Sequence, residues 1–217
     1  MNYKLAIFDL DGTILDTLED LTDGVNYALS ECGYPVRTIA EVRRFVGNGI
    51  RKLIERALPA GTPEAEIDRV HGIFSPYYKA HCDVKTKPYD GIPEMLQALR
   101  AAGMETAVLS NKGDFAVQPL IRHYFPDLFT LAFGERPGIP RKPAPDAVFE
   151  ILERLGTDKA DAVYIGDSNV DIETARNAGL SCICVDWGFR DRAQLIEDGA
   201  ERIVSTPEAL RKALLGT

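Results

Sequence analysis

Two aspartates near the start of the chain, Asp9 and Asp11, have a spacing that allows them to act together. They follow the apolar run at residues 5–8, whose length and flanks predict a buried strand. Because side chains along a strand repeat with period two, both carboxylates can project into the same space. Buried carboxylates this close repel each other unless a cation neutralises them. The pair therefore predicts either a bound divalent metal or a shared proton, with Gly12 turning the backbone sharply away.

Further polar side chains follow two other predicted strands or precede a helix, namely Ser110, Asn111, Lys112, Lys142, Asp167 and Asp171. Because the carboxyl ends of parallel strands meet at one edge of a sheet, we expect all of them to lie near Asp9. Carboxylates can hold Mg²⁺, while a lysine and hydrogen-bond donors can bind phosphoryl oxygens. This combination of groups predicts phosphoryl transfer.

Short apolar runs alternate with helical periods through most of the chain. The runs that predict strands are residues 4–8, 105–109, 128–133, 162–165 and 181–185. Strands that are apolar on both faces and alternate with helices predict an α/β protein whose parallel sheet is covered on both sides.

The alternation is interrupted after the aspartate pair. Residues 16–83 show helical patterns and no convincing strand, so we expect residues 1–15 and 84–217 to form the α/β core and residues 16–83 a small all-helical cap. Both connections of the cap lie beside the candidate site, where a hinge motion could cover it and exclude water. The alternative is a helical domain with no part in catalysis. Asp20 and Asp23 on its first helix are interpreted as solvated side chains.

Four short motifs resemble, in their order along the chain, those of the haloacid dehalogenase superfamily of phosphohydrolases: Asp9-x-Asp11-Gly12-Thr13, Ser110-Asn111-Lys112, Lys142-Pro143 and Gly166-Asp167-Ser168-x-x-Asp171. The helical segment after the first motif is similar to that family's first class of cap. The resemblance implies a Rossmann-like parallel sheet, dependence on Mg²⁺ and an aspartyl-phosphate intermediate.

The same resemblance implies a role for each acidic residue. Asp9 would be the nucleophile and a ligand of Mg²⁺. Asp11 would protonate the leaving oxygen and then deprotonate the attacking water, and its backbone carbonyl would also bind the metal. Asp167 would bind the metal directly, and Asp171 either directly or through a water molecule.

The other motif residues would bind the phosphoryl group. Ser110 would donate its hydroxyl to a phosphoryl oxygen, with Asn111 assisting, and Lys142 would offset the negative charge on the nucleophile and the phosphoryl group. Helix capping is the structural alternative for the serine and for the later aspartates, because serine and aspartate are common at helix starts.

A glycine-rich segment of the predicted cap, Gly47-Asn48-Gly49, resembles the cap loop of phosphoglycolate phosphatases. Its glycines would expose backbone N–H groups at a helix start, where a carboxylate can bind. The alternative is a break that lets two cap helices pack. We therefore expect 2-phosphoglycolate as the substrate, with β-phosphoglucomutase or inorganic pyrophosphatase activity as alternatives on the same chemistry. A non-catalytic phospho-acceptor or regulatory module is the alternative from a different class.

The composition argues against several other functions. The net charge is −8, whereas nucleic-acid binding needs a clustered basic surface, so we expect a small anionic phosphate ester and no nucleic acid as the partner. No apolar run has membrane-spanning length, and Asp9 comes too early for a secretory signal. The four cysteines are interpreted as buried free thiols. We expect a cytoplasmic protein, either a monomer or a homodimer.

Overall fold

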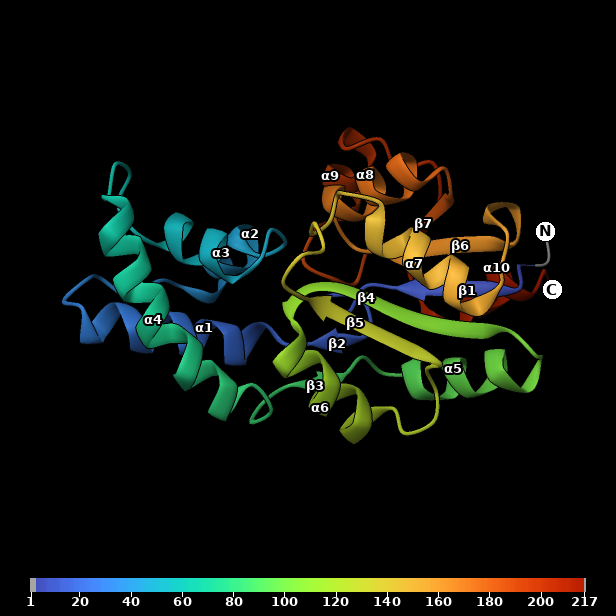
Figure 1. Ribbon diagram of the computed structural model, residues 1–217, viewed down its shortest axis with the longest axis horizontal. Helices are drawn as coiled ribbons and strands as arrows, with labels where there is room; N and C mark the ends of the chain where they lie inside the picture. Colours follow the sequence, from blue (N-terminus) through green and yellow to red (C-terminus); the bar gives the residue numbers. More distant parts are fainter. Residues whose placement is uncertain (1–2, 217) are drawn as a thin grey trace.

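The computed structural model describes residues 3–216. Within that range six parallel strands form one sheet (Figure 1), in the spatial order β5 (Leu131–Glu135), β4 (Glu105–Gly113), β1 (Leu5–Phe8), β6 (Ala162–Gly166), β7 (Ser181–Val185) and β8 (Ile203–Val204). The predicted parallel sheet is confirmed. The strand expected over residues 128–133 begins three residues later, and β4 continues through the second motif. The two residues of β8 are too few to produce a recognisable hydrophobic pattern.

Helices cover both faces of the sheet (Figure 1), with α5 (Ile92–Ala101), α6 (Asp114–Tyr124) and α10 (Pro207–Leu215) on one face and α7 (Asp146–Leu155) and α8 (Asn169–Ala178) on the other. The central strand β1 contributes to both layers because its side chains alternate in direction. Ala6 and Phe8 pack in the first layer, and Leu5 and Ile7 in the second. All four side chains are fully buried, which explains the continuous apolar run in the sequence.

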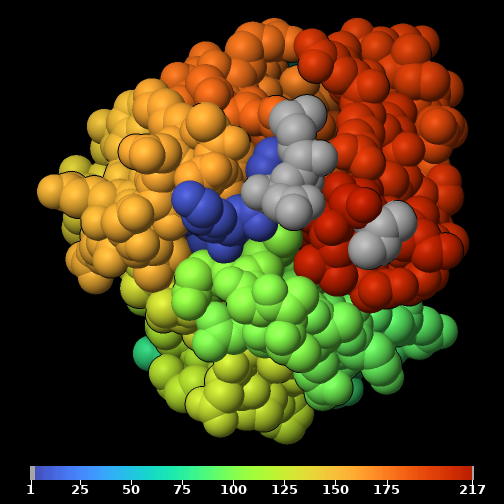
Figure 2. Space-filling view, turned by 90° about the vertical axis from the view of Figure 1, so that its right-hand side faces the viewer, coloured from blue at the N-terminus to red at the C-terminus, as the bar shows by residue number. Residues whose placement is uncertain are grey.

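Figure 2 shows the end of the core where the chain begins. Lys4 forms an ion pair of 2.7 Å with Asp161, at the end of the short 3₁₀ helix η1 (Lys159–Asp161), and Tyr3 belongs to the hydrophobic cluster that α10 also joins. The strands run away from this end, so their carboxyl ends face the helical segment on the opposite side (Figure 1). One further short helix of the core, α9 (Arg192–Glu197), lies between β7 and β8 in the chain.

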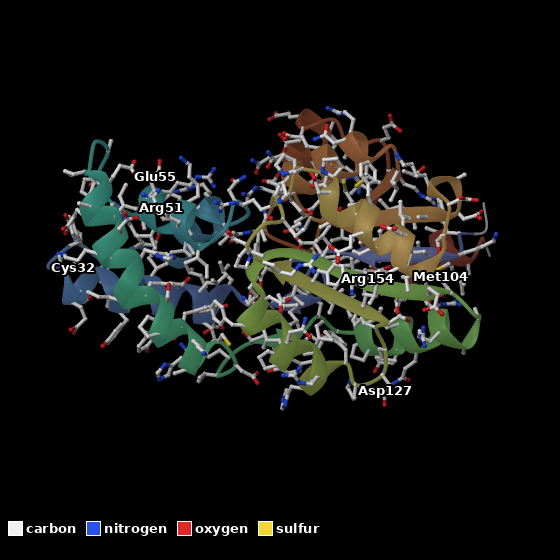
Figure 3. The ribbon with its side chains drawn as sticks, in the orientation of Figure 1. Cys32, Arg51, Glu55, Met104, Asp127 and Arg154 are labelled. Atoms are coloured by element: carbon white, nitrogen blue, oxygen red, sulfur yellow. The ribbon has the colours of Figure 1, made fainter. Side chains whose placement is uncertain are left out.

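A separate bundle of helices lies beyond the carboxyl ends of the strands (Figure 1): α1 (Leu18–Glu31), α2 (Ile39–Phe45), α3 (Ile50–Ala57) and α4 (Glu64–His81). It has a hydrophobic cluster of its own, which includes Leu29, Leu53 and Phe74. On its outer side Arg51 of α3, labelled in Figure 3, pairs with Asp68 of α4 at 3.0 Å. The helical cap expected from the sequence is therefore present on the α/β core.

The chain leaves and re-enters the core along two short strands that lie side by side. These strands, β2 (Leu15–Asp16) and β3 (Lys87–Pro88), pair in the antiparallel sense. The two connections of the cap are therefore held together directly beside the carboxyl end of β1.

Asp20 is not the solvated side chain that the sequence analysis expected. It is 3% exposed, and its carboxylate accepts hydrogen bonds from the backbone N–H groups of Val84, Lys85 and Thr86 at 2.9–3.1 Å. Asp23, in contrast, is exposed and forms an ion pair of 2.7 Å with Lys85. The error arose because helical periodicity cannot show a partner more than sixty residues later in the chain.

Among the described helices, none combines the length and the apolar character that crossing a membrane requires. The four cysteines are free; Cys82 and Cys184 are buried, whereas Cys32 and Cys182 are half-buried.

The hydrogen bonds that Asp20 accepts from residues 84–86, which we call the Asp20 clamp, lead to a testable prediction about stability. Asp20→Ala leaves several buried backbone N–H groups without their acceptor, and we expect it to lower the free energy of unfolding by about 3 kcal/mol. Asp23→Ala is the matched control and should change it by less than about 0.5 kcal/mol. Urea denaturation measures both values, and equal losses in the two variants would contradict the clamp.

Candidate active site

The first motif lies where β1 ends, and backbone hydrogen bonds form its turn. The carbonyl of Leu10 accepts from the N–H of Leu15 at 3.0 Å, which bends the chain back beside the strand. Gly12 has a φ of 83°, and a Cβ atom there would overlap the carboxylate of Asp167. Asp9 directly precedes this turn and is 8% exposed. Its Oδ1 accepts a hydrogen bond from the N–H of Leu10 at 2.7 Å.

Lys142 lies directly between two of the predicted acids. Its Nζ is 2.9 Å from Oδ1 of Asp9 and 2.8 Å from Oδ1 of Asp171, and the residue is 4% exposed. Burial by itself lowers the pKa of Lys142, but the carboxylates of Asp171 and Asp9 raise it well above its ordinary value. The ammonium group therefore stays charged and offsets part of the negative charge around it.

The carboxylates of Asp9, Asp167 and Asp171 form one buried group, in which each offers an oxygen within 4.8 Å of the others. Burial raises the pKa of Asp9 to about 7, with Lys142 opposing this effect and Asp171 reinforcing it. Burial and the charges of Asp171 and Asp9 also raise the pKa of Asp167 well above its ordinary value. The single positive charge of Lys142 cannot neutralise all three carboxylates. Buried carboxylate oxygens in this arrangement fit a divalent cation.

The start of α8 positions the two later acids. Oδ2 of Asp171 accepts from the hydroxyl of Ser168 at 2.7 Å and from the N–H groups of Ser168 and Asp167 at 3.1 and 3.2 Å. Asp167 in turn accepts from the N–H of Phe189 at 2.6 Å. Asp171 therefore takes part in capping the helix, as the structural alternative expected, and contacts Lys142 at the same time.

Asn111 joins three segments at the site. Its Nδ2 donates to the carbonyls of Gly47 and Lys142, both at 3.0 Å, and its Oδ1 accepts from the N–H of Lys142 at 2.9 Å. The adjacent Ser110 is 4% exposed, and its hydroxyl oxygen accepts from the N–H of Lys112 at 3.2 Å. The second motif thus connects the core to the cap loop as well as supplying a hydroxyl.

The carboxylate of Asp11 is not part of the group that the other three acids form. Its Oδ1 accepts from the hydroxyl of Thr17 at 2.7 Å and from Nζ of Lys112 at 3.0 Å. The Lys112 side chain is 2% exposed and also donates to the hydroxyl of Tyr78 on cap helix α4. Burial lowers the pKa of Lys112, but Asp11 and Tyr78 raise it above its ordinary value, so this ammonium group stays charged as well.

A partly open cavity of about 40 Å³ lies between the core acids and the cap. On the core side Asp9, Asp11, Ser110, Asn111 and Asp167 reach its wall. On the cap side its wall is largely apolar and includes Leu21, Val46, Ile50, Leu53 and Tyr78. Gly47 and Gly49 of the predicted loop also line this cavity, whereas Asn48 lines a separate groove together with Lys142.

Sequence reasoning missed a reciprocal pair of arginine contacts between the cap and the core. Arg190 follows β7 and donates to the carbonyls of Arg43 and Val46 at 2.9 and 2.8 Å. Arg43 donates back to the carbonyls of Gly188 and Phe189 at 2.6 and 2.9 Å. These partners are more than 140 residues apart in the chain, and no local pattern indicates either contact.

Comparison with known proteins agrees with this geometry. Residues 6–185 match the haloacid dehalogenase-like hydrolase family. The chain is 34% identical to a phosphoglycolate phosphatase of Agrobacterium fabrum over 97% of this chain and 91% of that protein, and 35% identical to one of Mesorhizobium japonicum over 88% and 86%. A crystal structure of a candidate phosphoglycolate phosphatase from Lactobacillus delbrueckii subsp. bulgaricus superposes with a TM-score of 0.97 at 42% identity over the whole of both chains. The chain therefore belongs to the haloacid dehalogenase-like hydrolase family, within which it is a phosphoric monoester hydrolase.

Proposed function

We propose that the chain hydrolyses a small anionic phosphate monoester, with 2-phosphoglycolate as the first candidate. The observation that carries this proposal is the small cavity between the acids of the core and the apolar wall of the cap, which Asp9, Ser110 and Asn111 all reach. Such a site suits a phosphate with a short leaving group. The named relatives, which are phosphoglycolate phosphatases, support the same choice.

The buried acids are the proposed site of Mg²⁺. Asp9, Asp167 and Asp171 would hold the ion, with the backbone carbonyl of Asp11 as a further ligand. Carboxylate oxygens are the ligands that Mg²⁺ prefers, and these three buried acids offer oxygens within 4.8 Å of one another. Bound Mg²⁺ would neutralise these acids and polarise the phosphoryl oxygens.

Asp9 is the proposed nucleophile. The N–H of Leu10 and the ammonium of Lys142 orient its carboxylate, which would form a bond to phosphorus while the bond to the leaving oxygen breaks. Such a covalent intermediate divides one difficult displacement into two easier steps. Ser110 and Asn111 would bind the phosphoryl oxygens, and Lys142 would offset their charge.

Asp11 is the proposed general acid and base. It would donate a proton to the leaving oxygen in the first step and accept a proton from the attacking water in the second. The water would release phosphate and restore Asp9. Thr17 and Lys112 hold the Asp11 carboxylate at the cavity wall, which supports a role in proton transfer at this position.

Residues 16–83 are the proposed mobile cap, and residues 1–15 and 84–217 the catalytic core. The hydrogen bonds that join the two across the site include those of Arg43 and Arg190, and Ala116 and Phe189 of the core also pack in the hydrophobic cluster of the cap. Polar contacts of this kind can break and re-form as a cap opens, and closing excludes water from the reaction.

The alternative functions have less support than the hydrolysis of 2-phosphoglycolate. β-Phosphoglucomutase activity is disfavoured because the relatives that are 34% and 35% identical over most of the chain are phosphoglycolate phosphatases. Inorganic pyrophosphate is small enough to fit, so the substrate experiment must include it. A non-catalytic phospho-acceptor or regulatory module is disfavoured because the chain belongs to a hydrolase family and retains the acids, the hydroxyl and the lysine together.

A panel of substrates tests the proposed specificity. In the presence of Mg²⁺ we expect kcat/KM for 2-phosphoglycolate to exceed that for sugar phosphates and for pyrophosphate by at least about tenfold, because the small cavity excludes larger leaving groups. Steady-state phosphate release measures these constants. A preference for sugar phosphates or pyrophosphate would refute the substrate while leaving the proposed chemistry intact.

Substitution of the two motif aspartates tests the proposed roles. Asp9→Asn should lower kcat by at least about 10³-fold for every ester, because the amide cannot attack phosphorus. Asp11→Asn should lower kcat by about 10²–10⁴-fold for alkyl esters and by less for p-nitrophenyl phosphate, whose leaving group needs no proton. Turnover that survives Asp9→Asn would exclude Asp9 as the nucleophile, and Asp23→Asn provides a control on an exposed acid.

The raised pKa of Asp9 predicts a pH-dependent stability when a chelator removes metal ions. Its folded-state pKa of about 7 lies above the unfolded value of about 3.9, so its contribution is fully present below about pH 4 and is lost as the pH rises through about 7. Asp9→Asn cannot ionise. Relative to the wild type, this variant should therefore gain at least about 1 kcal/mol in unfolding free energy between about pH 5 and pH 8.

Chemical denaturation at the two pH values, with and without Mg²⁺, measures this gain. Added Mg²⁺ should stabilise the wild type more than the Asp9→Asn protein at the higher pH, because the ion binds the ionised carboxylate. A stability difference between the two proteins that does not change with pH would contradict the assignment.

A further inference from the structure

Lys112 lines the cavity and carries a charge for which the catalytic scheme gives no role toward the substrate. Its Nζ atom lies 3.0 Å from Asp11 and within hydrogen-bond distance of Tyr78. An ammonium group has three N–H donors, and the described residues accept two of them. The third remains for a ligand in the cavity.

The surroundings of Lys112 indicate what kind of ligand group it would bind. The cap side of the cavity is apolar, with Leu21, Ile50 and Leu53 in its wall. A substrate carboxylate placed there without a partner would lose its hydration at a large cost in free energy. A buried ammonium group that forms a charge-assisted hydrogen bond removes that cost.

The other cation at the described part of the cavity wall is Arg190, which holds the cap. Three of its five N–H donors bind the carbonyls of Arg43, Arg44 and Val46, at the end of cap helix α2. The loop at residues 47–49 is the competing site for a carboxylate, but it offers only backbone N–H dipoles, whereas Lys112 offers a full positive charge.

We infer that Lys112 is the residue that recognises the carboxylate of the substrate, and that Tyr78 positions its ammonium group for this contact. The inference rests on the proposed function. It adds the residue that distinguishes 2-phosphoglycolate from a phosphate ester of the same size whose leaving group has no charge. Tyr78 belongs to α4, and its ring centre lies 4.7 Å from Nζ of Lys112. The cap must therefore be in place for the carboxylate site to be complete.

The test compares two substrates that differ in one group, 2-phosphoglycolate and ethyl phosphate, which has a methyl group in place of the carboxylate. We expect Lys112→Met to lower the ratio of their kcat/KM values, phosphoglycolate over ethyl phosphate, by about 10- to 100-fold, because one charge-assisted hydrogen bond is lost. The ratio is used because Lys112 also contacts Asp11 and a substitution will affect both rates. Lys112→Arg should recover part of the ratio.

Thr17→Val is the matched control, because Thr17 is the other side-chain donor to Oδ1 of Asp11. This variant should lower both kcat/KM values and leave their ratio within about twofold of the wild type. If Lys112→Met also leaves the ratio unchanged, Lys112 does not bind the carboxylate and the inference is wrong. If the wild type itself shows no preference for 2-phosphoglycolate over ethyl phosphate, the proposed substrate and the inference both fail.

Tyr78→Phe tests the positioning role. Loss of the hydroxyl should raise KM for 2-phosphoglycolate by about three- to tenfold with a smaller effect on kcat. A purely structural role in the cap would instead lower kcat for both esters alike.

A crystal structure of the wild type with 3-phosphonopropionate, a non-hydrolysable phosphonate with a carboxylate, tests the contact without any substitution. A carboxylate oxygen should lie within about 3.2 Å of Nζ of Lys112. A carboxylate bound at the loop of residues 47–49 would overturn the inference even if the Lys112→Met protein failed to fold.

Discussion

The gathering of acidic side chains around Lys142 is the interaction on which the rest of the structure depends. Asp9 and Asp171 both lie within 3 Å of its ammonium nitrogen, in surroundings that exclude water. Burial of several carboxylates at one edge of a sheet is unfavourable unless positive charge accompanies them. The strand ends, the turn after β1 and the start of α8 are all arranged so that this charge can be supplied.

Close packing of the backbone makes that arrangement sterically feasible. A Cβ atom at Gly166 would overlap Asp171, and one at Gly188 would overlap Asp167 and the carbonyl of Gly12. These glycines are therefore required by the acids beside them rather than by a turn alone. Gly166 belongs to the fourth motif, whereas the requirement at Gly188 became apparent only from the position of its loop.

Polar contacts couple the cap to the catalytic edge. Asn111 binds the carbonyl of Gly47, Arg190 binds that of Val46, and Lys112 binds the hydroxyl of Tyr78. Each of the three core residues is buried at or beside the site. A change in the position of the cap therefore alters groups at the cavity wall, which links substrate enclosure to the geometry of the reacting residues.

The sequence by itself determined the parallel α/β core, the helical cap and the short motifs, because hydrophobic periods and turn residues act between neighbours in the chain. It could not reveal that Asp20 is buried against the returning chain, that Arg190 reaches α2, or that Lys112 lies between Asp11 and the cap. Each of these contacts joins residues at least 34 positions apart. Only the packing of the cap on the core decides them, since distant side chains meet according to the tertiary arrangement and not according to local pattern.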